Sequence, residues 1–293
     1  MRILLALLPA ALLLAPSRPA AAQADPFDRA PSRFASFAGG RIHYKSLGTG
    51  RRAVVFVHGW ASDLSAWRYQ AAALDGRARL IALDLPGHGR SSAPDRDYSM
   101  RFYAEAVRAV LDAAGVERAV LVGHSMGTPV IREFYRMAPG RTDALVVVDG
   151  NLRAPGLDSA AVERQVALFR GPEAKARWGQ MIEPMLPGPE RAAVRRRVIA
   201  TAESTPEHVV TGSIRGMMDP AVWSPDPIKV PLLVVVAKGP NWPPDYRAFV
   251  AELAADLRYE ELAGVHHFLM LERPDLFNPI LIEFLRAQGA LTA

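Results

Sequence analysis

The chain alternates between short apolar runs and longer amphipathic segments. Near the N-terminus, the sequence FASFAGGRIHYKSLG at 34–48 predicts two short strands on either side of the Gly39-Gly40 turn. Further runs are continuously apolar and rich in β-branched residues, which is typical of strands buried on both faces of a sheet. A weaker strand pattern, LRYEEL, follows at 257–262. The apolar runs lie at 53–59, 78–84, 118–123, 143–150 and 231–237.

The segments between these runs have the spacing of amphipathic helices. An example is SMRFYAEAVRAVLDAAG at 99–115, in which Ser99 can cap the first turn and Gly115 can end the helix. Apolar strands that alternate with helices build a parallel sheet with helices on both faces. The pattern therefore predicts an α/β protein with a mostly parallel, eight-stranded sheet flanked by helices.

One long stretch interrupts the alternation. From about Leu152 to about Pro227 the sequence is helical in pattern, divided by prolines, rich in Met and Trp, and without a strand pattern. We interpret it as a helical lid inserted after the sixth strand. The predicted organisation is a signal peptide at 1–24, the first part of the core at 25–151, the lid at 152–228 and the second part of the core at 229–293.

The N-terminal sequence MRILLALLPAALLLAPSRPAAAQADP has the features of a secretory signal peptide. One early cation, Arg2, precedes an apolar stretch from Ile3 to Leu14 and then small residues that fit cleavage after Ala22 or Ala24. The apolar stretch is shorter than the roughly 20 residues that a spanning helix needs. We therefore expect a periplasmic or secreted protein without stable membrane insertion, and a retained anchor is the weaker interpretation.

Composition excludes several kinds of chemistry. The chain has 293 residues, half of them hydrophobic, and no cysteine. Disulfides, thiolate catalysis and thiolate metal sites are therefore excluded. The net charge of +5 comes from basic residues that are scattered, apart from Arg195–Arg197, and the sequence contains no nucleic-acid-binding motif. We expect no nucleic-acid partner, and the sequence does not indicate an oligomeric state.

The sequence LVGHSMGTPV, Leu121–Val130, places Ser125 between two glycines directly after an apolar run. A serine on a tight strand-to-helix turn needs small neighbours two residues away on each side, and Gly123 and Gly127 provide them. The hydroxyl group is then exposed at the carboxyl edge of the sheet, where ligands of α/β proteins bind. We interpret Ser125 as a nucleophile.

Four segments together make the chain resemble α/β-hydrolases that carry a lid: FVHGW, LDLPGHGRSS, VGHSMG and GVHHFLMLERPDLFN. The resemblance covers nearly all of the chain after the signal segment. It implies that the backbone amides of Trp60 and Met126 form the oxyanion hole. It also implies that His267, which directly precedes Phe268, is the catalytic base, while its neighbour His266 is the competing candidate.

The acid partner of the histidine is missing from its usual place in this family, a GxxD pattern after the seventh strand. Here Pro240 occupies that position and the next carboxylate is Asp245. Asp149, at the end of the sixth strand, is our first candidate, because some relatives, including haloalkane dehalogenases, orient their histidine from there. Asp245 reaching back is the second possibility, and the absence of any acid is the third.

These features predict an exported serine hydrolase that cleaves a small-molecule carboxylic ester or lactone through an acyl-enzyme, without cofactor or metal. A hydrolase-fold binding protein without catalysis, and a cofactor-free haloperoxidase or perhydrolase that uses the same triad, remain alternatives. Aromatic and Met side chains suggest an adaptable apolar acyl site. The candidate substrate-binding residues are Trp178, Met181, Met217, Trp223 and Trp242.

Overall fold

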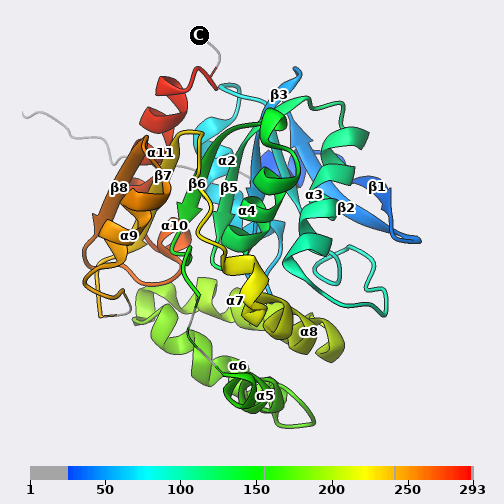
Figure 1. Ribbon diagram of the computed structural model, residues 1–293. Helices are drawn as coiled ribbons and strands as arrows, with labels where there is room; N and C mark the ends of the chain where they lie inside the picture. Colours follow the sequence, from blue (N-terminus) through cyan, green and yellow to red (C-terminus); the bar gives the residue numbers. More distant parts are fainter. Residues whose placement is uncertain (1–25, 155, 157, 241, 292–293) are drawn as a thin grey trace, which may run out of the picture.

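A computed structural model describes residues 26–154, 156, 158–240 and 242–291 (Figure 1). The predicted signal peptide and its two cleavage sites lie outside these residues, so export stays a prediction. Among the helices that the structure describes, none is both long enough and apolar enough to cross a bilayer.

An eight-stranded sheet forms the centre of the molecule, in the order β1-β2-β4-β3-β5-β6-β7-β8. Strand β2 is antiparallel to both β1 and β4, and every other neighbouring pair is parallel. The predicted mostly parallel sheet flanked by helices is therefore confirmed. The strands are β1 (Arg33–Phe37), β2 (Gly40–Leu47), β3 (Arg52–Val57), β4 (Leu80–Leu83), β5 (Arg118–His124), β6 (Thr142–Val148), β7 (Leu232–Ala237) and β8 (Leu257–Leu262).

Helices cover both faces of this sheet because the central strands are apolar on both sides. In β3, Val55 and Val57 pack into one hydrophobic cluster, while Val54 and Phe56 pack into the other. The first cluster includes α3 (Met100–Ala113), α4 (Gly127–Met137) and α9 (Tyr246–Leu253), and the second includes α2 (Arg68–Leu74), α10 (Leu269–Glu272) and α11 (Pro274–Ala287). The short helix α1 (Pro26–Arg29) precedes the sheet, and η1 (Leu64–Trp67) and η2 (Pro139–Arg141) are single 3₁₀ turns.

A helical segment, defined here as the described part of 152–228, connects β6 to β7. No strand occurs among its described residues, and Figure 1 shows α5, α6 and α8 together at one end of the molecule. Helix α8 is joined to the rest of the fold by two hydrogen bonds. One runs from Trp60 Nε1, in the loop after β3, to the Val210 carbonyl at 3.1 Å, and the other joins the hydroxyls of Tyr103 in α3 and Ser213 at 2.6 Å. The elements of the helical segment are α5 (Ser159–Leu168), α6 (Ala174–Ile182), η3 (Glu183–Met185), η4 (Pro189–Arg191), α7 (Ala192–Ser204), α8 (Glu207–Met218) and η5 (Pro220–Trp223).

Candidate active site

Ser125 lies on a tight turn between β5 and α4, with a backbone φ of 51°. Few residues other than glycine adopt this left-handed conformation, so the turn is strained at Ser125. A Cβ atom on Gly123 would lie 2.5 Å from the Gly127 carbonyl oxygen, and one on Gly127 would lie 2.4 Å from the Val57 carbonyl oxygen. Backbone is therefore packed against backbone on both sides of Ser125, which is why both flanking positions require glycine.

Asp149 follows β6 and orients the imidazole ring of His267. Its Oδ2 accepts a hydrogen bond from His267 Nδ1 at 2.7 Å, and its Oδ1 accepts one from the Ala237 amide at 2.8 Å. The Asp149 residue is only 7% exposed and, with φ 44°, also occupies the left-handed region. Donation from Nδ1 leaves Nε2 as the unprotonated nitrogen of the neutral ring, which is the tautomer that a general base needs.

A second histidine, His124, holds the backbone of the loop that carries His267. Its Nε2 donates to the His267 carbonyl at 2.8 Å, and the two ring centroids are 4.7 Å apart. Burial lowers the pKa of His124 well below its usual value, and the neighbouring His267 lowers it further. His124 is therefore a neutral hydrogen-bond donor that holds the backbone of this loop. These contacts do not give His124 the role of a base.

The alternative candidates have partners of their own. Asp245 accepts two hydrogen bonds from Arg153, at 3.1 and 3.0 Å, and these lower the pKa of its carboxyl group. The ring of His266 is bonded to Glu272 at 3.0 Å. The structure therefore pairs Asp149 with His267, and it pairs neither Asp245 nor His266 with the other members of the site.

Two backbone amides near Ser125 lack a hydrogen-bond acceptor among the described residues. Within the described part of the chain, neither the Met126 nor the Trp60 N–H donates a hydrogen bond. The backbone at Gly59 passes close to the serine, since a Cβ there would lie 3.1 Å from Ser125 Cβ. His58 shapes this loop, because its ring donates to the Gly59 carbonyl and accepts from the Leu85 amide. Free donors next to a nucleophile are suited to stabilising an oxyanion.

A pocket of about 230 Å³ opens over these groups. The predicted residues Met217, Trp223 and Trp242 line it together with the serine, the aspartate and the histidine. Its lining consists of Ser125, Met126, Pro129, Asp149, Gly150, Asn151, Met217, Met218, Trp223, Trp242 and His267. Although Ser125 and His267 share the pocket, the described side chains form no hydrogen bond between Ser125 Oγ and the imidazole.

Two of the predicted substrate-binding residues are not part of this lining. Trp178 is 4% exposed and packs in the core against Trp60 and Phe169, with ring centroids 4.8 and 4.7 Å away. Met181 packs against the same core cluster. Sequence reasoning missed Pro129, Gly150 and Asn151 as lining residues. Gly150, the last residue of the run at 143–150, was an available signal. The structure shows why glycine stands there, since a Cβ on Gly150 would lie 2.0 Å from Thr128 Oγ1.

The described residues contain no group of three or more His, Asp or Glu side chains that could hold a metal ion. The acidic and basic side chains that line the pocket are Asp149 and His267. The described groups that border this pocket include the Ser125 hydroxyl group and the imidazole ring that Asp149 orients.

Comparison with known proteins agrees with this arrangement. The family model described as the alpha/beta hydrolase fold matches residues 52–192. A putative carbamate hydrolase, RutD, of Azorhizobium caulinodans is 29% identical over 255 residues, which cover 83% of this chain and 94% of the relative. Other curated relatives are 36% and 35% identical over 116 and 146 residues, and the aligned part spans only 31% and 41% of their length.

Solved structures agree as well. The enol-lactonase from Burkholderia xenovorans LB400 has a TM-score of 0.77 at 22% identity, over 87% of this chain and 100% of its own. The esterase RhEst1 from Rhodococcus sp. ECU1013 has a TM-score of 0.75 at 25% identity, over 88% and 99%. Taken with the sheet order and the turn at Ser125, these similarities show that the chain has the alpha/beta hydrolase fold.

Proposed function

We propose that the protein is a serine hydrolase that cleaves a small, uncharged carboxylic ester or lactone with an apolar acyl group. The observation that carries this proposal is that Ser125, Met126 and the Asp149-oriented His267 all border one pocket, while the Met126 amide donates no hydrogen bond among the described residues. A nucleophile, a base and an oxyanion donor are the groups that acyl transfer needs. The relatives described as a carbamate hydrolase, an enol-lactonase and an esterase support the same reaction class.

The reaction would run in two halves. Ser125 Oγ attacks the carbonyl carbon as His267 Nε2 takes the hydroxyl proton, and the amides of Met126 and Trp60 hold the negative oxygen. His267 then gives this proton to the leaving alkoxide, which departs and leaves the acyl group on Ser125. Water attacks the acyl-enzyme with His267 again as the base, and the acid product is released.

The pocket supports the substrate class. About 230 Å³ is less than the 300 Å³ or more that is usual for drug-sized ligands, which favours a small acyl group. Met217, Met218 and Trp223 give the wall an adaptable apolar surface. No Lys or Arg lines the pocket among the described residues, so nothing there would neutralise an anionic acyl chain.

The test is hydrolysis of p-nitrophenyl esters with acyl chains of two to twelve carbons and of simple lactones, with Ser125→Ala as the matched control. We expect the highest kcat/KM for short and medium neutral acyl chains, and loss of nearly all activity in the variant. A fluorophosphonate probe should label the parent protein and leave Ser125→Ala unlabelled. Equal rates for both proteins, or no labelling of folded parent protein, would contradict the proposal.

A further inference from the structure

A buried carboxylate lies directly behind the candidate base. Glu272, the last residue of α10, has a side chain that is 0% exposed, although a carboxylate is costly to bury without partners. Its Oε2 accepts a hydrogen bond from the His266 amide at 2.8 Å, and its Oε1 lies 3.0 Å from His266 Nδ1. The residue next to His267 is therefore held through both its backbone and its ring.

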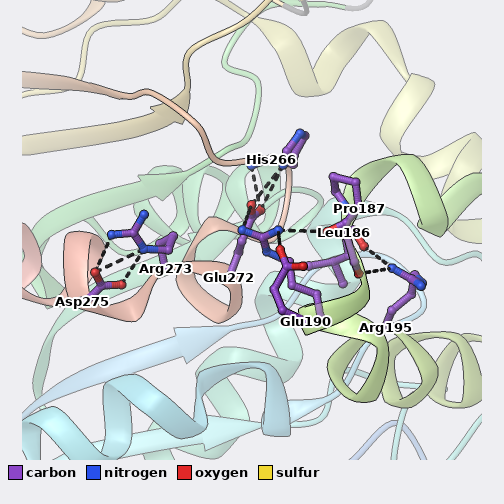
Figure 2. Close-up of polar contacts among 10 residues, drawn as sticks. Leu186, Pro187, Glu190, Arg195, His266, Glu272, Arg273 and Asp275 are labelled. Atoms are coloured by element: carbon purple, nitrogen blue, oxygen red, sulfur yellow. Dashed lines mark hydrogen bonds and ion pairs between the residues drawn. The ribbon is translucent and has the colours of Figure 1, made fainter.

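The charge of Glu272 is balanced from the helical segment. Arg191 Nη2 lies 3.0 Å from Glu272 Oε1, and Arg191 also donates to the Pro187 carbonyl at 2.9 Å and pairs with Glu190. Arg195 donates to the carbonyls of Leu186 and Gly188 at 2.7 and 3.1 Å. Figure 2 shows Glu272 between His266 and the turn at 186–191 of the helical segment. The turn is thus fixed internally and directs one guanidinium group at Glu272.

The Arg191–Glu272 ion pair joins the middle of the helical segment to the core. Among the ion pairs of the described residues, those that join the helical segment to the rest of the chain near its ends are Arg153–Asp245 and the pairs of Asp226 with Arg132 and Arg136. Between these ends, Arg191–Glu272 is the pair that reaches the core. It meets the core at Glu272 in α10, and the same carboxylate is bonded to His266 in the loop that carries His267.

We propose that Glu272 is a positioning residue for His267, and that Arg191 makes this positioning depend on the placement of the helical segment. The Glu272 carboxylate holds the backbone amide of His266, the residue before His267. His124 holds the backbone carbonyl of His267 itself. Asp149 orients the ring of a residue whose backbone is held from both sides, so loss of either contact displaces Nε2 within the pocket that His267 shares with Ser125. Displacement of about 1 Å at a catalytic group costs up to about a hundredfold in rate. This inference rests on the proposed hydrolase function.

The test compares Glu272→Leu, which removes both the acceptor and the charge, with Glu272→Gln, which keeps an acceptor for the His266 amide. Rates are divided by the number of active sites, titrated with a fluorophosphonate, so that misfolded protein is not counted. We expect Glu272→Leu to lower kcat about tenfold or more with KM within about twofold, and Glu272→Gln to recover a large part of that loss. Asp275→Asn is the matched control, because Asp275, three residues after Glu272, is exposed and pairs with Arg273. Equal losses in Glu272→Leu and Asp275→Asn, or a kcat within twofold of the parent in Glu272→Leu, would overturn the positioning role.

The coupling to Arg191 has its own test. If Arg191 acts through Glu272, Arg191→Met should add little to Glu272→Gln, so the double variant should have the kcat of Glu272→Gln within about twofold. Fully additive losses would show that Arg191 acts independently and would overturn the coupling.

One readout does not depend on turnover. The Nδ1 proton of His267 should give a downfield proton resonance, assigned by its loss in Asp149→Asn, and this resonance should shift or broaden in Glu272→Leu and stay in place in Asp275→Asn. An unchanged resonance in Glu272→Leu contradicts the positioning role even if the protein hydrolyses no ester. A parent protein without hydrolysis contradicts the proposed function alone.

Discussion

Asp149 Oδ2 and His267 Nδ1 lie 2.7 Å apart, although 118 residues separate them in the chain. The carboxylate comes from the end of β6, next to the strand that precedes Ser125, and not from the loop after β7. Its second oxygen is bonded to the Ala237 amide, so the carboxylate is fixed before it meets the imidazole. The carboxylate that contacts His267 therefore lies at the end of β6, and Pro240 stands where the GxxD pattern would place an aspartate.

Replacement of Asp149 by Asn should reduce kcat by roughly a thousandfold or more, because the amide no longer selects the Nδ1–H tautomer and no longer stabilises the imidazolium. Asp245→Asn is the control, since that carboxylate is exposed and pairs with Arg153. We expect its kcat within about twofold of the parent. Steady-state rates at equal folded fraction, from urea melts, check both. A large loss in Asp245→Asn with little loss in Asp149→Asn would reverse the assignment.

The sequence predicted the features that depend on local pattern. Continuous β-branched runs located β3 to β7, and the glycines around Ser125 located the turn, because both reflect packing that any α/β sheet imposes on its strands. Asp149 was proposed from its place at the carboxyl end of a central strand together with the resemblance to relatives, including haloalkane dehalogenases, that orient their histidine from there.

Features that depend on contacts between residues far apart in the chain could not be predicted from the local sequence pattern. Trp178 and Met181 lie on an amphipathic helix, and the sequence does not say which face of that helix meets the pocket and which meets Trp60. The partner of Glu272 lies 81 residues away in a segment without strand periodicity, so only the three-dimensional structure brings the two residues together.

Gly127→Ala should destabilise the protein severely, because the new methyl group would lie 2.4 Å from a backbone oxygen, that of Val57, which cannot rotate away. We expect a loss of about 3 kcal/mol in the free energy of unfolding, at the upper end for a single substitution. Gly140→Ala is the matched control, since its Cβ would meet nothing within 4 Å. Urea unfolding of both variants measures the difference, and similar stabilities would refute the proposed backbone contact.

Trp178 and Trp223 should differ in what their loss affects. Trp178→Ala removes a buried ring from the core and should cost about 3–5 kcal/mol of unfolding free energy while the preference among acyl chains stays the same. Trp223→Ala enlarges the pocket and should shift that preference toward longer acyl chains. Acyl-chain profiles measured beside thermal melts distinguish the two. A changed profile in Trp178→Ala would mean that this side chain contacts substrate after all.

Acid should destabilise the fold through buried histidines before its carboxylates are protonated. Burial lowers the pKa of His88 to about 3, whereas an unfolded histidine titrates near about 6.5. Below that unfolded value, unfolding takes up a proton that the folded ring refuses, so stability falls as the pH drops from about 6.5 toward about 3, by up to about 1.4 kcal/mol per pH unit. The lowered pKa values of His58 and His124 act in the same direction. Urea melts between pH 7.5 and 4.5 should therefore show a steep decline, made shallower by His88→Gln and left unchanged by the same substitution at the exposed His208. Parallel declines in the parent and His88→Gln would mean that His88 is not the neutral, buried group that its surroundings imply.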